Sequence, residues 1–247
     1  MTKVPRKSAG RAKKKPPRKM TSREELNLLM RSTVFTNWGK SRWREIFYLS
    51  AKQVQHVPRS SRSRQETVGE HSWQLVMTTW IAIEAFKLPL DANKAIKYAL
   101  VHDAGSEWYG GDTPAFQKNG NGCAEVPCRK KKAALEEKSR ERLRRGVGSK
   151  LPFLMKSIDD YEAGIDEEAW FVNALDKLLA DINILQDSGY TNKRLGADLP
   201  TVDLYKRPRI ERNSRVLAWY EELFKIWLKH ETKFFPTRKK ATQEAVS

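Results

Sequence analysis

Residues 70–86 read EHSWQLVMTTWIAIEAF, and apolar side chains recur there at intervals of three and four positions. This spacing returns to one face of a helix with 3.6 residues per turn, so it predicts an amphipathic helix with a broad apolar face formed by Trp73, Met77, Trp80 and their neighbours. No alternating strand pattern of useful length and no internal repeat is visible, so we predict an all-α fold. The other stretches expected to be helical are 43–54, 92–104, 166–185, 213–234 and a segment starting near Thr21.

Two of these helices carry start signals. Ser22 and Glu25 have the spacing of a capping box, in which the two side chains bind each other's backbone N–H groups. Three acidic residues open the segment 166–185, and negative charge is favourable at the positive end of a helix dipole. Residues 133–145 are so highly charged that they predict either a helix or a disordered arm.

The charge of the chain is concentrated in two places. The 247 residues carry a formal net charge of +17, of which residues 1–20 contribute nine Lys or Arg and no acid, and residues 129–150 contribute a net +7. The rest of the chain is close to neutral, at a net +1. We expect residues 1–20 to be a disordered basic tail because they cannot bury enough apolar surface to offset the entropy of ordering. Residues 21–236 are then one helical domain with a basic insertion around 117–150, followed by a loose tail at 237–247.

The same composition limits partners and compartment. The basic tail binds nucleic acid non-specifically or only aids solubility, and both interpretations remain open. No apolar run is long enough for a transmembrane helix, and the basic N-terminus lacks the apolar segment of a secretory signal. Cys123 and Cys128 cannot form a disulfide framework, which favours a reducing compartment. We expect a cytoplasmic protein, or a nuclear one if the source is eukaryotic, because KKKPPRK has the composition of an import signal.

Histidine and aspartate at a few positions are the candidate chemical groups. His71 opens the helix at 70–86, His102 and Asp103 lie near the end of the next one, and Asp176 interrupts the apolar pattern of residues 166–185. Taken singly, His71 suits a helix cap and Asp176 suits a solvent-facing position. Taken together, imidazoles and carboxylates from adjacent helices can surround one divalent ion.

Three ordered motifs carry a family resemblance. QETVGEHSWQLV (65–76), ALVHDAGSEWYGGDTPAF (99–116) and ALDKLLADI (174–182) resemble the HD-domain phosphohydrolase superfamily, in particular its 5′-deoxynucleotidase-like branch. The resemblance implies an all-α helical bundle with a metal site between helices. It implies His71, His102, Asp103 and Asp176 as metal ligands. Glu107 and Asp112 correspond to the acids that position water or move a proton.

The chain departs from this pattern twice. One extra residue separates His102-Asp103 from Glu107, and it turns a helix by about 100°, so Asp112 is the safer catalytic assignment. Relatives with nucleotidase activity often carry an Arg-Trp pair shortly before the first motif, whereas this chain has arginines without a tryptophan there. Guanidinium groups match phosphate in a bidentate way, so these arginines are candidate phosphate contacts or else ordinary loop residues. The candidate substrate contacts are Arg59, Arg62, Arg64 and, as a pocket wall, Trp108.

The resemblance implies a metal-dependent hydrolase of nucleotides. Two imidazoles and two carboxylates suit Mn, Co, Zn, Ni or Fe, and the absence of further histidines between His102 and Asp176 favours one ion. The expected reaction converts deoxynucleoside 5′-monophosphates to deoxynucleoside and phosphate. The alternatives are deoxynucleoside triphosphate hydrolysis on the same metal core and, in another class, a basic nucleic-acid-binding protein with a relict HD site. Relatives are commonly dimers, so the resemblance is compatible with a homodimer or higher homo-oligomer.

Overall fold

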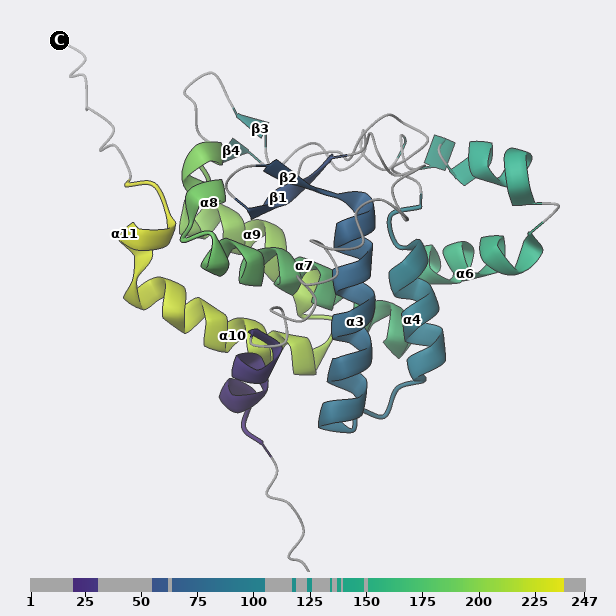
Figure 1. Cartoon of the computed structure of the whole chain (residues 1–247), viewed down its shortest axis with the longest axis horizontal. Coiled ribbons are helices and arrows are strands. Elements are labelled where there is room, and N and C mark those ends of the chain that lie inside the picture. Colours follow the sequence, from purple (N-terminus) through teal and green to yellow (C-terminus); the bar gives the residue numbers. More distant parts are fainter. Residues whose placement is uncertain are drawn as a thin grey trace, which may run out of the picture.

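The structure is a computed structural model in which helices form the bulk of the described chain (Figure 1). It describes residues 20–30, 55–61, 64–104, 117–118, 124–125, 134, 137–138, 140–148 and 151–237. Within that part of the chain, the predicted all-α class is confirmed, with two short antiparallel hairpins added. None of the helices in these ranges has the length and apolar character that crossing a membrane requires.

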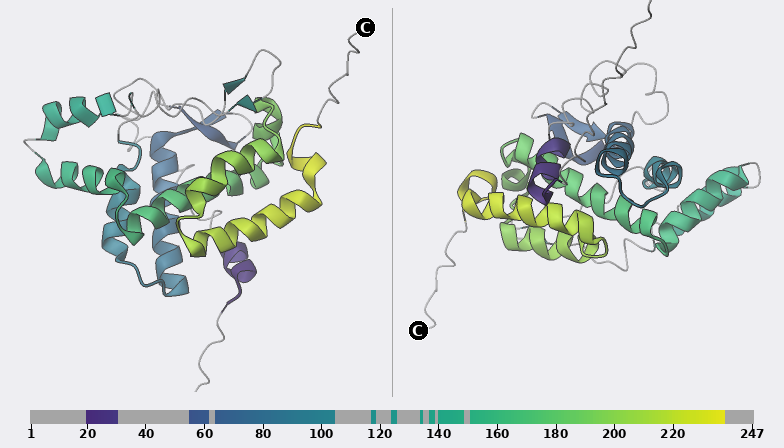
Figure 2. Two further views of the ribbon diagram at one scale, coloured as in Figure 1. Left: turned by 180° about the vertical axis from the view of Figure 1, so that it is seen from behind. Right: turned by 90° about the horizontal axis from the view of Figure 1, so that it is seen from below.

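Most of the helices pack around one central helix, α7 (Glu167–Gln186). The pair α3 (Val68–Phe86) and α4 (Ala92–Val101) lies on one side of it, and α9 (Leu199–Ile210) and α10 (Ser214–Lys229) lie on the other (Figures 1 and 2). The remaining elements are the helix at residues 22–30, α6 (Pro152–Ala163), α8 (Tyr190–Leu195), α11 (Glu231–Phe234), the π-helical turn η2 (Arg144–Gly148), β1 (Gln55–Ser61), β2 (Arg64–Thr67), β3 (Gln117–Lys118) and β4 (Ala124–Glu125).

The start of α7 is fixed by the acidic residues that predicted it. Asp166 is the N-cap, and its side chain accepts a hydrogen bond from the Ala169 backbone N–H at 2.8 Å. The same carboxylate accepts from the Tyr98 hydroxyl at 2.9 Å and lies 3.1 Å from the Lys94 ammonium, so it also ties α4 to α7. This predicted helix is confirmed over nearly its whole length.

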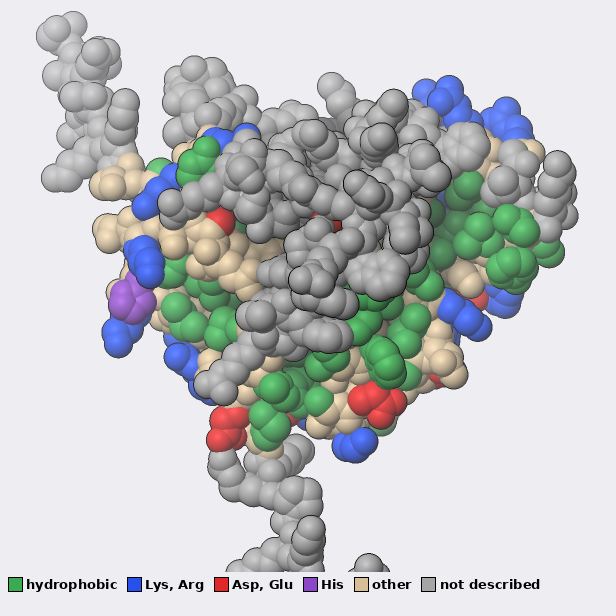
Figure 3. Space-filling model, viewed as in Figure 1, with side chains coloured by type: hydrophobic (Ala, Val, Ile, Leu, Met, Phe, Trp, Pro, Cys, Tyr) green, Lys and Arg blue, Asp and Glu red, His purple; other side chains and the backbone are tan. Residues whose placement is uncertain are grey.

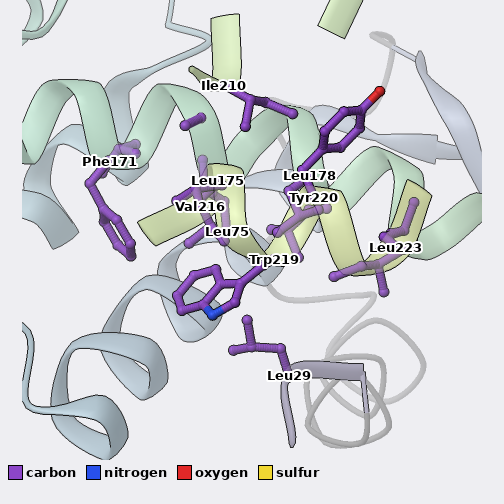
Figure 4. Close-up of a cluster of buried hydrophobic side chains, with 14 of the residues drawn as sticks. Leu29, Leu75, Phe171, Leu175, Leu178, Ile210, Val216, Trp219, Tyr220 and Leu223 are labelled. Carbon is purple, nitrogen blue, oxygen red and sulfur yellow. The ribbon is translucent and has the colours of Figure 1, made fainter. Parts of the chain in front are cut away.

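The core lies between α7 and the helices around it (Figure 4). Leu175 and Leu178 of α7 and Leu75 of α3 are completely buried in it, and Trp219 of α10 packs edge-on against Phe171 with ring centroids 6.3 Å apart. Leu29, from the helix at residues 22–30, belongs to the same cluster although it lies far away in the sequence. Segments from both ends of the described chain therefore share one core.

The apolar face predicted for α3 is confirmed only in part, because Ile83 is buried and Val76 and Phe86 pack against the core but the two tryptophans do not. Trp73 and Trp80 are 39% and 49% exposed, whereas the buried stripe of α3 contains polar side chains as well as apolar ones. The physical reason is that His71 and Gln74 make buried hydrogen bonds to α7, so the side of α3 that carries them faces α7 and the two tryptophans do not. The buried residues of α3 are Val68, Glu70, His71, Gln74, Leu75, Thr78, Thr79, Ala82 and Ile83.

The capping box at the N-terminal helix is also displaced by one residue. Thr21 and Glu24, rather than Ser22 and Glu25, exchange the two bonds: Thr21 N–H donates to Glu24 Oε2 at 2.8 Å, and Glu24 N–H donates to Thr21 Oγ1 at 3.3 Å. Glu25 is instead buried and accepts a hydrogen bond from Trp219 Nε1 at 2.8 Å. The contact with Trp219 thus occupies the Glu25 carboxylate, which the local sequence pattern had assigned to the helix cap.

The basic block around residues 133–145 is helical where the structure describes it. Leu143 anchors it in a small apolar cluster with Val101 of α4 and Ile158 of α6. Arg140 pairs with Glu137 and Glu162. Separate Lys or Arg side chains lie at the upper right edge of Figure 3, next to a hydrophobic area. The segment is thus held against α4 and α6 rather than extended as a free arm. Residues 1–19, 31–54 and 238–247, with the tails and the helix expected at 43–54, lie outside the described residues.

Candidate metal centre

Three of the four predicted metal ligands come together where α3, α4 and α7 meet. His71 lies in the first turn of α3, His102 directly follows α4, and Asp176 lies in the middle of α7. One possible ligand atom from each lies within 4.8 Å of the other two, and all three side chains are buried. The local alternatives, a helix cap for His71 and a solvent-facing Asp176, are therefore wrong.

The distances in this cluster suit a single ion. His71 Nε2 and Asp176 Oδ1 lie 2.8 Å apart, and the rings of His71 and His102 have centroids 5.2 Å apart. Two ligand atoms at right angles on an ion with bonds of about 2.1 Å lie about 3 Å apart, and opposite ligands lie about 4.2 Å apart. The cluster needs only small side-chain adjustments to surround one divalent ion.

The orientation of His102 leaves one ring nitrogen for a ligand. Its Nδ1–H donates to the backbone carbonyl of Ala99 at 2.9 Å, and because a carbonyl only accepts, Nδ1 must carry the hydrogen. In the neutral ring, Nε2 then holds the lone pair that a metal requires. Asp103 Oδ2 lies 3.3 Å from this Nε2, so the fourth predicted ligand flanks the cluster, with a side chain 21% exposed.

Electrostatics keep Asp176 ionised. Burial raises the pKa of the Asp176 carboxyl, but the charge of Lys177 and the contact with His71 outweigh burial and hold the pKa well below its usual range. Burial lowers the pKa of His102, yet the carboxylate charges of Asp103 and Asp176 raise it above its ordinary value. A carboxylate that stays charged in a buried site is the form that a cation needs.

A second polar contact between α3 and α7 lies next to the cluster. The side-chain amides of Gln74 and Asn183 exchange two hydrogen bonds of 3.0 Å each, and both residues are buried. Gln74 is one turn from His71 on the same helix. The amide pair therefore fixes how α3 is placed along α7 at the point where His71 meets Asp176.

Polar residues around Asp176 were not selected from the sequence. Lys177 donates a hydrogen bond to Asp176 Oδ2, and Asn173 Nδ2 donates to the Tyr161 hydroxyl of α6 at 3.4 Å. Asn173, Asp176 and Lys177 have the i, i+3, i+4 spacing of one helix face. That spacing in an otherwise apolar segment was the signal that could have found them; Tyr161 carried none.

Several predicted site residues lie outside the described part. The structure does not describe four of them, namely Arg62, Glu107, Trp108 and Asp112. Arg59 lies in β1 and Arg64 in β2, whose antiparallel pairing leads directly into α3. This hairpin packs against α3 and α7, so its backbone passes close to the two helices that bear His71 and Asp176. The roles assigned to these residues stay predictions.

Comparison with known proteins identifies the family of this helical protein with a buried His–His–Asp cluster. The family model described as "HD domain" matches residues 51–217, more than half of the chain. The protein belongs to the HD domain family. A crystal structure of a predicted metal-dependent phosphohydrolase from Magnetospirillum magnetotacticum MS-1 has a similar fold, with a TM-score of 0.59 and 22% sequence identity over 85% of this chain and 97% of that one. A search among curated proteins found no match.

Proposed function

We propose that this protein is a metal-dependent phosphohydrolase that converts deoxynucleoside 5′-monophosphates to deoxynucleoside and phosphate. The observation that carries the proposal is the buried cluster of His71, His102 and Asp176 in a chain of the HD domain family. The description of the Magnetospirillum protein as a predicted metal-dependent phosphohydrolase supports the reaction type. The nucleotide substrate rests on the sequence motifs around His71, His102 and Asp112.

The described residues have distinct tasks in this proposal. His71, His102 and Asp176 would hold one divalent ion, and Asp103, which lies beside them, would be the fourth ligand. A bound divalent ion lowers the pKa of a water ligand and polarises a phosphoryl oxygen. The ammonium of Lys177 neutralises part of the negative charge that a phosphate brings next to Asp176.

The remaining tasks fall to residues outside the described ranges. Asp112, with Glu107, orients the attacking water or takes its proton, because a carboxylate within hydrogen-bond reach is a competent general base. Arginines of the hairpin region, Arg59, Arg62 and Arg64, bind the phosphate oxygens, and Trp108 forms a wall of the substrate pocket.

Separate incubation with deoxynucleoside monophosphates and triphosphates tests the substrate. The purified protein is loaded with Mn²⁺, Co²⁺, Zn²⁺, Ni²⁺ or Fe²⁺, and the released phosphate species are identified by ³¹P NMR. Release of orthophosphate from monophosphates supports the proposal, whereas release of tripolyphosphate from dATP reassigns the protein as a triphosphohydrolase. Absence of turnover with every nucleotide and metal removes the nucleotidase proposal.

Matched variants separate metal chemistry from the basic tail. Asp103→Ala should abolish metal binding and hydrolysis together, whereas Asp112→Asn should keep the metal and slow turnover. Loss of metal in Asp112→Asn would make Asp112 a ligand instead. Deletion of residues 1–20 serves as the opposite control: if it abolishes the only detectable function while Asp103→Ala does not, the protein is a nucleic-acid binder with a relict site.

A further inference from the structure

Tyr161 of α6 is a buried tyrosine whose hydroxyl contacts α7, the helix that carries Asp176. Tyr161 is 8% exposed, and its ring packs against Tyr98 with centroids 5.8 Å apart at an interplanar angle of 50°. Its hydroxyl oxygen accepts a hydrogen bond from Asn173 Nδ2 at 3.4 Å. Packing by α4 and a contact with α7 therefore hold the phenol in one place.

The hydroxyl hydrogen of Tyr161 has no acceptor among the residues that the structure describes. Asn173 supplies a donor, so the oxygen is satisfied while the O–H group still has a hydrogen bond to give. A buried hydroxyl whose hydrogen has no acceptor destabilises the folded protein. An oxygen atom of a ligand is therefore a favourable acceptor for it.

The surroundings of Tyr161 place this donor near the metal ligands. Burial raises the pKa of the Tyr161 hydroxyl above its usual range, the charges of Asp176 and Asp103 raise it further, and the charge of Lys177 lowers it. Asn173, the contact of the hydroxyl, precedes Asp176 by one helical turn. The phenol stays neutral at physiological pH, so it can donate to a phosphate without adding negative charge.

We propose that the Tyr161 hydroxyl, oriented by Asn173, donates a hydrogen bond to an oxygen of the phosphoryl group bound at the His71–His102–Asp176 centre. Tyr161 is thus a substrate-binding residue that recognises phosphate itself, whichever nucleotide carries it. The inference rests on the proposed function in one respect, namely that the centre binds a phosphate ester.

Tyr161→Phe and Tyr98→Phe form a matched pair of variants. Both residues are buried tyrosines of one ring pair, and each substitution removes only an oxygen atom and keeps the packing. The Tyr98 hydroxyl donates to Asp166 at the start of α7, away from the centre. The measurements are binding of inorganic phosphate to the Mn²⁺-loaded protein by calorimetry, Mn²⁺ affinity, the midpoint of thermal unfolding, and kcat and KM.

Tyr161→Phe should weaken phosphate binding by about 10- to 100-fold, the range for a hydrogen bond to a charged group. It should lower kcat/KM by a similar factor while Mn²⁺ affinity and the unfolding midpoint stay near those of the wild type. Tyr98→Phe should lower the unfolding midpoint and leave phosphate binding within twofold of the wild type. Wild-type phosphate affinity in Tyr161→Phe, or an equal loss in both variants, would overturn the inference.

The phosphate measurement separates this inference from the nucleotidase proposal. If the wild type binds phosphate but hydrolyses no nucleotide, the nucleotidase proposal fails, and the comparison of the two variants still decides the role of Tyr161. If the wild type hydrolyses monophosphates and Tyr161→Phe does so equally well, only the role of Tyr161 fails. If the Mn²⁺-loaded wild type binds no phosphate, the inference about Tyr161 fails, whereas the nucleotidase proposal is still decided by the turnover assay.

Discussion

Replacing Lys206 by methionine should destabilise the protein in a manner that depends on pH. Lys206 is buried in α9, and its ammonium lies 3.2 Å from Asp181 Oδ1 of α7, which is completely buried. The same ammonium donates a hydrogen bond to the backbone carbonyl of Lys177 at 2.9 Å. Methionine keeps the length and packing of the side chain and removes its charge.

The magnitude follows from the pKa of Asp181. Burial raises this pKa to about 6, although the charge of Lys206 lowers it, whereas an unfolded chain has a value of about 3.9. The folded state therefore holds the proton more tightly, and stability falls as pH rises from about 4 to about 6. Removing Lys206 raises the folded pKa further. The stability that the variant loses relative to the wild type therefore begins to grow near pH 6, by at most about 1.4 kcal/mol per pH unit. Its upper limit is the roughly 3–5 kcal/mol that an uncompensated buried charge costs.

Urea unfolding at pH 5.5 and pH 8 measures this effect. Lys206→Met should differ little from the wild type at pH 5.5, where Asp181 is largely protonated in both folded proteins, and should be less stable by about 2–3 kcal/mol at pH 8. Lys225→Met is the control, because Lys225 is 65% exposed in its pair with Glu222 and a surface pair contributes about 0–1 kcal/mol. A stability loss of the same size at both pH values would refute the reasoning, since it would show that the charge of Asp181 is not involved.

Two further predictions concern contacts of α7 and of the turn that follows it. Gly189→Ala should destabilise the protein by at least about 1–3 kcal/mol in urea unfolding. The reason is that Gly189 has φ +75° and an added Cβ would lie 2.4 Å from the Phe234 backbone. An unchanged midpoint would contradict this close approach. Gln74→Leu should lower the free energy of unfolding by about 1–3 kcal/mol, because the buried Asn183 amide loses its hydrogen bonds to Gln74. The double variant with Asn183→Leu should recover part of that loss. Additive losses would exclude coupling between the two amides.

Local signals predicted those parts of the fold that local interactions determine. The acids at the start of α7 and the apolar period behind them appear in the structure as an N-cap and a buried helix. The exact cap at Thr21 and the buried side of α3 could not be predicted in this way, because Glu25 and His71 have partners more than 100 residues away. The hairpin of β1 and β2 was missed because its strands contain Pro58 and mostly polar residues without an apolar alternation.

The candidate site shows the same division. A family resemblance selected His71, His102 and Asp176, and the structure brings these three side chains together. The distances between them depend on how three helices pack, which no local pattern contains. Tyr161 was not found because a tyrosine in a polar helix looks like any half-buried residue. Its position is recognisable only once α6 has been placed against α7.

The long sequence separations within the core and the site set an order for folding during synthesis. His71 and Asp176 are 105 residues apart, and Glu25 and Trp219 are 194 residues apart. At about 5–20 residues per second, a ribosome needs roughly 5–20 s to make the chain between the first two and roughly 10–40 s for the second two. The N-terminal helix therefore leaves the ribosome well before its packing partner on α10 exists, and the core cluster of Leu26 and Leu29 stays incomplete during that interval. A nascent chain arrested before α10 is complete should consequently be a better substrate for chaperones and proteases than the finished protein.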